Sequence, residues 1–151
     1  MLKLGMIGTD GGAFSPGHAM LVCQMINRGD YDAKFVAVYG EDEKETREIA
    51  EACDVSFIAE YYTDLLGRVD AVCVMPRNGN SHLKYALPFV EQGLPVFIDK
   101  PFTCTVEDAE KLVSSAKKSG SVICGGSYVK YAEQVTELKR KVSEATSVES
   151  G

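Results

Sequence analysis

The chain has 151 residues, of which 45% are hydrophobic and 25% charged, a balance typical of a soluble globular domain with a substantial core. Its net charge of −6 excludes the general basic footprint of a nucleic-acid-binding protein and a polybasic patch for membranes. No apolar run approaches the roughly 18 residues needed to cross a bilayer, and the apolar part of the N-terminus is too short for a secretory signal.

The first half of the chain alternates short apolar runs with helical stretches. The first predicted helix has Ser15 at its N-cap and Pro16 at its first position, where proline's missing N–H costs nothing. The second carries apolar residues at i, i+3, i+4 and i+7, the spacing of one helix face. The predicted strands are 2–8, 34–40 and the less certain 56–59, and the predicted helices are 15–29, 42–53 and a short turn at 63–67.

The second half repeats the same alternation. Pro88 lies inside one predicted helix and should kink it or end it early, because proline removes a backbone hydrogen bond. Thr105 should cap the next helix and Gly120 should end it. The predicted strands are 69–75, 95–98 and 121–129, and the predicted helices are 81–93, 105–120 and 131–145, the last with Val135, Leu138 and Val142 as its apolar residues.

Strands separated by helices predict βαβ units and a parallel sheet. The expected architecture is an α/β, doubly wound, Rossmann-like domain of six strands, spanning residues 1–146. In this arrangement segments 2–8 and 69–75 are neighbouring parallel strands at the centre of the sheet. Ligands then bind at the carboxyl ends of the strands, near the point where the strand order reverses.

Three polar or glycine-rich loops should meet at that edge: 8–18, 76–82 and 99–103. In the first loop Gly8 begins a G-x-G-x-x-G/A spacing, but Asp10 replaces the second glycine and would repel a pyrophosphate. Gly11 and Gly12 could supply an alternative cradle of backbone N–H groups. This loop is therefore either a phosphate-binding turn or a glycine turn that binds nothing.

The end of the second strand is the usual place for an acid that binds the ribose hydroxyls. Gly40 occupies that position, and Glu41 follows one residue later, close enough to reach the ribose. Asp42 and Glu43 are better explained as acids that complement the dipole of the following helix. An acidic cluster repels a 2′-phosphate, so NAD is favoured over NADP.

The five cysteines are scattered without a CxxC pair, and the chain has only two histidines, His18 and His82. This pattern indicates reduced thiols in a cytoplasm, buried as small apolar residues. It also predicts that the chain has no metal site.

Segments 3–19 and 69–120 resemble the N-terminal half of the Gfo/Idh/MocA oxidoreductases, the family of glucose–fructose oxidoreductase and inositol dehydrogenase. The most specific part is 69–120, where Asp99, Lys100 and Pro101 replace the family's usual E-K-P. The resemblance implies an NAD(P)-dependent enzyme, a homo-oligomer acting on a hydroxyl-bearing carbon of a sugar, a cyclitol or a derivative. It also implies a second, substrate-binding domain, of which residues 147–151 would be the start.

The resemblance implies roles for particular residues. Lys100 would be catalytic and directed toward the nicotinamide and the substrate, while Asp99 helps to hold the motif; the alternative is a surface Lys-Pro turn. His82 is either a cofactor residue or a residue that caps and packs its helix, and nothing is implied for Ser127. The short turn after Lys100 favours a cis Lys100–Pro101 bond. The expected cofactor-binding residues are Gly8, Thr9, Gly11, Gly12, Glu41, Pro76, Asn78, His82, Asp99 and Pro101.

A non-catalytic Rossmann-like module is the competing interpretation. Asp10 and Gly40 depart from a dinucleotide site and favour a domain that senses a nucleotide or binds a partner protein. The motif at Asp99, Lys100 and Pro101 and the convergence of the loops favour the oxidoreductase. On either interpretation this chain by itself binds cofactor at most.

Overall fold

The structure is a computed structural model and describes residues 1–9 and 17–144. Its centre is a six-stranded sheet in the order β3-β2-β1-β4-β5-β6, with every neighbouring pair parallel. The adjacency of β1 and β4 confirms the doubly wound prediction, and the strand order reverses between them. The strands are β1 (Leu2–Ile7), β2 (Ala33–Tyr39), β3 (Phe57–Ile58), β4 (Ala71–Val74), β5 (Val96–Ile98) and β6 (Ile123–Gly125).

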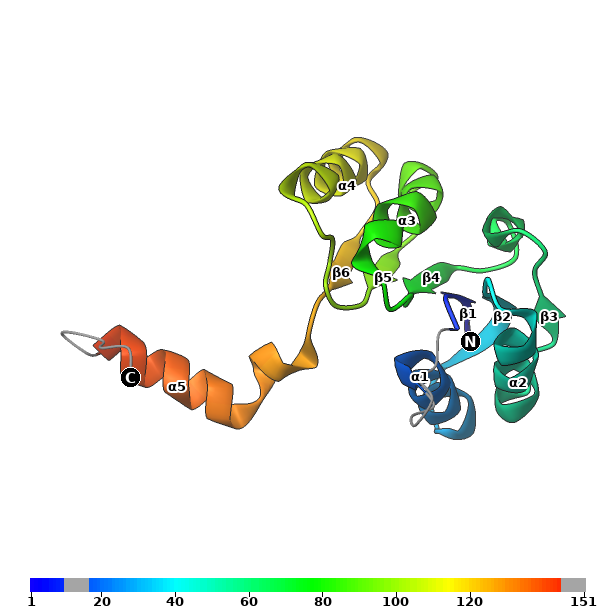
Figure 1. The fold of residues 1–151 in the computed structure, drawn as a ribbon, viewed down its shortest axis with the longest axis horizontal. Helices are drawn as coiled ribbons and strands as arrows, with labels where there is room; N and C mark the ends of the chain where they lie inside the picture. Colours follow the sequence, from blue (N-terminus) through cyan, green and yellow to red (C-terminus); the bar gives the residue numbers. More distant parts are fainter. Residues whose placement is uncertain (10–16, 145–151) are drawn as a thin grey trace.

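Helices cover both faces of the sheet (Figure 1). The helices α1 (Gly17–Arg28) and α2 (Glu43–Cys53) lie on one face, and α3 (His82–Glu91) and α4 (Val106–Ser119) lie on the other. Each face has its own apolar core, since a sheet between two helix layers must bury side chains on both sides. Met6, Phe35 and Ile49 belong to the first core, and Phe89 and Leu112 belong to the second.

The helix ends follow the sequence signals closely. The side chain of Asp42 accepts a hydrogen bond from the Glu45 N–H and caps α2, and Thr105 caps α4 in the same way. Gly120 ends α4 with φ of 77°, a left-handed conformation that favours glycine. Of the two outcomes expected at Pro88, a kink or an early end, the early end does not occur at the proline, because α3 continues past Pro88 to Glu91. Ser15 and Pro16 lie outside the described residues.

Several elements are shorter than predicted. The strand expected at 121–129 ends at Gly125, since Gly126 has φ of 92° and a 3₁₀ turn, η3 (Tyr128–Tyr131), follows. The turn expected at 63–67 is a 3₁₀ helix, η1 (Tyr62–Leu65), and a further one, η2 (Gly79–Ser81), precedes α3. An apolar run in the sequence thus overstated the paired length of the strand.

The prediction for the cysteines was wrong for two of the five. All five thiols are free, and Cys23 and Cys53 are buried, but Cys104 and Cys124 are exposed. Burial raises the pKa of both Cys23 and Cys53, so these thiols stay protonated at neutral pH. Cys124 lies on the edge strand β6 beside Phe97 of β5, whose side chain is also exposed.

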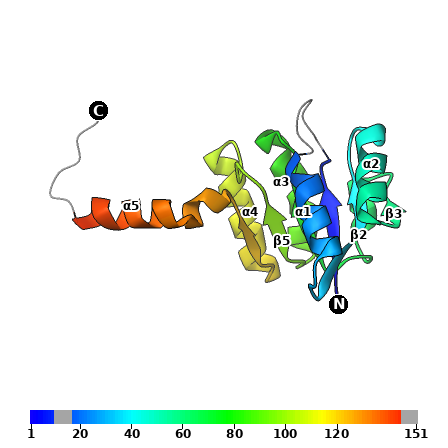
Figure 2. The ribbon, with the colours of Figure 1, turned by 90° about the horizontal axis from the view of Figure 1, so that it is seen from below.

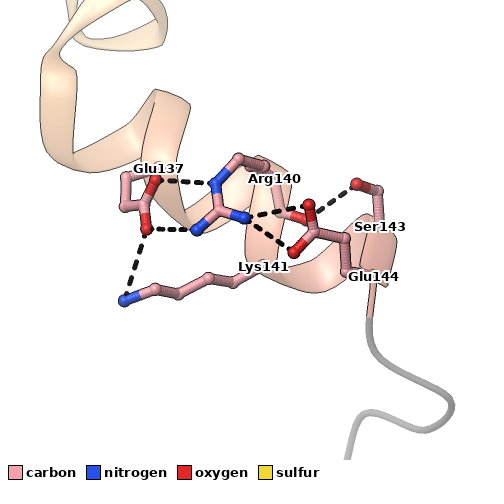
Figure 3. Close-up of polar contacts among 5 residues, drawn as sticks. All are labelled: Glu137, Arg140, Lys141, Ser143 and Glu144. Atoms are coloured by element: carbon pink, nitrogen blue, oxygen red, sulfur yellow. Dashed lines mark hydrogen bonds and ion pairs between the residues drawn. The ribbon is translucent and has the colours of Figure 1, made fainter.

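The helix α5 (Glu133–Glu144) projects away from the sheet and buries none of its residues (Figures 1 and 2). Ion pairs join polar side chains along this helix. Arg140 pairs with Glu137 at 2.7 Å and with Glu144 at 2.7 Å, and Lys141 also pairs with Glu137 (Figure 3). These are i,i+3 and i,i+4 pairs, which support a helix locally. Leu138 and Val142, predicted as its apolar face, are exposed. Within 1–9 and 17–144, no helix combines the length and apolar character needed to cross a membrane.

Candidate functional site

The three predicted loops meet at the carboxyl edge of β1, β4 and β5. Gly8 has φ of 92°, and a Cβ added to it would lie only 2.4 Å from the backbone nitrogen of Pro76. A Cβ on Gly79 would lie 2.5 Å from Cγ of Pro101. Glycine at these two positions therefore permits the loop after β4 to lie directly against both of its neighbours.

His82 lies between two of these loops and is completely buried. Its Nε2 lies 2.8 Å from the carbonyl oxygen of Pro76, and its Nδ1 lies 3.3 Å from the carbonyl oxygen of Phe102. Both ring nitrogens thus face backbone of this chain. This placement favours the packing alternative, in which His82 ties the loop after β4 to the loop after β5.

A small cavity of about 110 Å³ opens beside the end of β2, and we call it the β2 pocket. Glu41 is the only carboxylate among its lining residues in the described part of the chain. Oε1 of Glu41 accepts a hydrogen bond from the hydroxyl of Tyr85, and Nζ of Lys84 lies 3.9 Å from the same oxygen. The lining residues are Gly8, Tyr39, Glu41, Pro76, Asn78, Ser81 and Tyr85.

The other acids near this pocket have structural roles. Asp42 caps α2, and Glu43 pairs with Arg47 at 2.5 Å one turn later on the same helix. This arrangement agrees with the prediction that Asp42 and Glu43 serve the helix start. Among the described residues, Glu41 is therefore the acid that faces the pocket.

Close packing explains why glycine occupies position 40. A Cβ at Gly40 would lie 2.0 Å from Oγ1 of Thr9 and 2.3 Å from Oγ1 of Thr46. Both threonines are buried, and their hydroxyls are 3.1 Å apart. Thr9 is one of the residues expected to bind cofactor, and its hydroxyl lies against that of Thr46 in the interior.

A larger cavity of about 350 Å³ lies between α1 and the ends of β5 and β6, and we call it the β5 pocket. Asp99 is nearly buried there, and its Oδ2 lies 2.9 Å from Nδ1 of His18. Lys100 is exposed and borders this pocket, and the Lys100–Pro101 bond is cis, as expected. The lining residues are His18, Leu21, Val22, Met75, Phe97, Asp99, Lys100, Gly126 and Ser127.

The structure brings most of the predicted residues to one edge of the sheet. Gly8, Glu41, Pro76 and Asn78 line the β2 pocket, and Asp99 and Lys100 line the β5 pocket. Pro101 packs against Gly79 in the loop after β4. Asp10, Gly11 and Gly12 lie outside the described residues.

Sequence reasoning missed Tyr85, His18 and Ser127 as site residues. Tyr85 reads as one apolar position of a helix, and its contact with Glu41 joins residues 44 apart in the chain. His18 contacts Asp99 across 81 residues. Long-range pairs of this kind leave no local pattern, although the meeting of the first and third loops could have suggested the pair of His18 and Asp99.

The sequence matches the oxidoreductase family with an NAD-binding Rossmann fold, GFO_IDH_MocA, over residues 2–127. The chain belongs to this family. It is 30% identical to the inositol 2-dehydrogenase of Paracoccus denitrificans over 96% of this chain and 42% of that protein. The chain thus spans less than half the length of this curated relative.

Solved structures share the fold at lower identity. The dehydrogenase WlbA of Bordetella pertussis, solved in complex with NADH and UDP-GlcNAcA, matches with a TM-score of 0.77 and 16% identity, over 95% of this chain and 42% of WlbA. Biliverdin reductase of Synechocystis, solved with biliverdin and NADP⁺, matches with a TM-score of 0.77 and 19% identity, over 94% of this chain and 43% of that one. One fold therefore accommodates either dinucleotide.

Proposed function

We propose that this family member is the cofactor-binding half of an NAD-dependent dehydrogenase that acts on a hydroxyl-bearing carbon of a sugar, cyclitol or derivative. The observation that carries the proposal is the meeting of three loops at the strand-order reversal, with the Glu41 carboxylate on one side and Lys100 on the other. The similarity to an inositol 2-dehydrogenase supports the substrate class.

The residues at the β2 pocket fit the adenosine ribose of NAD. A carboxylate is an acceptor for ribose hydroxyls, and Glu41 presents one beside Gly8, the residue that follows β1. A 2′-phosphate in the same place would meet that negative charge. This chemistry favours NAD over NADP.

Lys100 supplies a positive charge at the β5 pocket. Its ammonium group can donate a hydrogen bond to a substrate hydroxyl and hold the reacting carbon, and such charge-assisted contacts also stabilise developing negative charge. The contact of Asp99 with His18 fixes the residue that precedes Lys100. The bound nicotinamide would supply the hydride acceptor or donor.

Calorimetric titration of the chain with NADH, NADPH and AMP tests the proposal. NADH should bind, and NADPH should bind at least about tenfold more weakly, a difference of about 1.4 kcal/mol. A chain that binds none of the three would be the non-catalytic interaction module. Tenfold tighter binding of NADPH would overturn the assignment of Glu41.

Lys100→Ala tests the catalytic role in a protein that joins this chain to its substrate domain. The substitution should lower kcat/KM by roughly a hundredfold or more, because it removes one charged transition-state contact. The affinity for NADH should change much less. Unaltered turnover would make Lys100 a surface residue of a tight turn.

We also place the enzyme in the cytoplasm as a homo-oligomer. The five free cysteines support a reducing compartment. The homo-oligomer rests on the family resemblance.

A further inference from the structure

We propose that Tyr85 and Lys84 set the preference for a ribose 2′-hydroxyl over a 2′-phosphate by holding the carboxylate of Glu41 at the β2 pocket. This inference rests on the proposed binding of a dinucleotide and adds the residues that determine which dinucleotide is bound. Tyr85 and Lys84 are adjacent residues of α3, whereas Glu41 follows β2, so the specificity element joins two βα units.

The carboxylate of Glu41 needs such support because most of its side chain is exposed. Its side chain is 70% exposed, and an unrestrained glutamate in that position would sample many rotamers in water. The Tyr85 hydroxyl and the Lys84 ammonium group both approach Oε1. Among the described residues the hydrogen bond to this carboxylate is made at Oε1, so Oε2 is the oxygen that we assign to a ribose hydroxyl.

Tyr85 is a rigid support. Its ring is almost completely buried and packs against both Tyr39 and Tyr62, with ring centroids 6.0 Å and 5.1 Å away. Edge-to-face and tilted contacts at these separations are favourable for aromatic rings. The position of the Tyr85 hydroxyl is therefore fixed by the core rather than by the glutamate.

Tyr85 also remains a hydrogen-bond donor over the whole useful pH range. Burial, together with the neighbouring Glu41 carboxylate, raises the pKa of the Tyr85 phenol above its usual value. The phenol thus stays protonated where an exposed tyrosine would begin to ionise. The support it gives to Glu41 should not weaken on moderate alkalisation.

Lys84 gives the arrangement a second possible state. Its ammonium nitrogen lies 3.9 Å from Glu41 Oε1 and 4.8 Å from the centroid of the Tyr85 ring. If Glu41 turned away, the same ammonium group would be free to pair with a phosphate. Tyr85 thus keeps the carboxylate of Glu41 in place, and that carboxylate in turn pairs with the charge of Lys84.

The test measures the dissociation constants of NADH and NADPH for the wild-type chain and for Tyr85→Phe. We expect the ratio Kd(NADPH)/Kd(NADH) to fall by roughly three- to tenfold in Tyr85→Phe, because one hydrogen bond to a charged group is lost. Adding Lys84→Met to Tyr85→Phe should then weaken NADPH binding by roughly threefold or more, since the cation that received the phosphate is gone.

Tyr62→Phe is the matched control, because it removes a hydroxyl from the same aromatic cluster without touching the Tyr85–Glu41 contact. In Tyr62→Phe the ratio Kd(NADPH)/Kd(NADH) should stay within about twofold of the wild-type value. A purely structural role for Tyr85 would weaken both dinucleotides equally, and that result, or an unchanged ratio, would overturn the inference. If the wild-type chain bound neither dinucleotide, the proposed function would fail instead.

Discussion

Replacing Gly8 with alanine is expected to lower the free energy of unfolding by about 3 kcal/mol or more. Two effects combine at this position. Alanine is strained at the φ of 92° that Gly8 adopts, and its Cβ would lie 2.4 Å from the nitrogen of Pro76, a backbone atom that cannot move aside alone. Urea denaturation measures the change, and the displaced Pro76 loop should also weaken NADH binding.

Gly67→Ala separates the two effects in the Gly8 experiment. Gly67 has φ of 75°, but a Cβ there would meet no atom within 4 Å. Gly67→Ala should therefore cost only the conformational strain, about 1–2 kcal/mol. Equal destabilisation by the two substitutions would show that the approach of Gly8 to Pro76 is unimportant.

Gly40→Ala is expected to destabilise the fold by about 1–3 kcal/mol through overpacking against Thr9 and Thr46. Gly40→Asp, which places an acid where doubly wound folds commonly carry it, should destabilise at least as much and should not improve NADH binding. Thermal unfolding and NADH titration on both variants check this expectation.

A double-mutant cycle identifies the cause of the Gly40 effect. In a Thr9→Ala, Thr46→Ala background both Oγ1 atoms are absent, so the cost of Gly40→Ala should fall by about 0.5 kcal/mol or more. Strictly additive costs would mean that the two hydroxyls are not what excludes a side chain at position 40.

The sheet and its order were predictable because local signals agree with one another. Thr105 and Gly120 mark the ends of α4, and alternating apolar runs and helices specify the parallel arrangement that places β1 beside β4. The ends of the strands were less predictable. The apolar character of 121–129 continues to Val129, but the register pairing with β5 ends at Gly125, and the last hydrogen bond to β5 runs from the Gly126 N–H to the Ile98 carbonyl.

The location of the candidate site was predictable, but the contacts between its residues were less so. Its loops could be found from their polar and glycine-rich composition, and Lys100 from its motif. From the sequence, glycine at position 40 suggested that an acid of the cofactor site had been lost. In the structure, Thr9 and Thr46 leave no room for a side chain at this position. The Tyr85 contact with Glu41 depends on how α3 lies against β2, which no local pattern encodes.

The two outermost strands have a consequence for how this domain behaves in a crowded solution. β3 has two residues and β6 has three, so each edge offers very little unpaired backbone to the strand of another molecule. Long, flat edges template aggregation, and very short ones resist it. The longer strands β1 and β2 lie inside the sheet with neighbours on both sides. The folded domain should therefore resist edge-to-edge fibril growth even at high concentration.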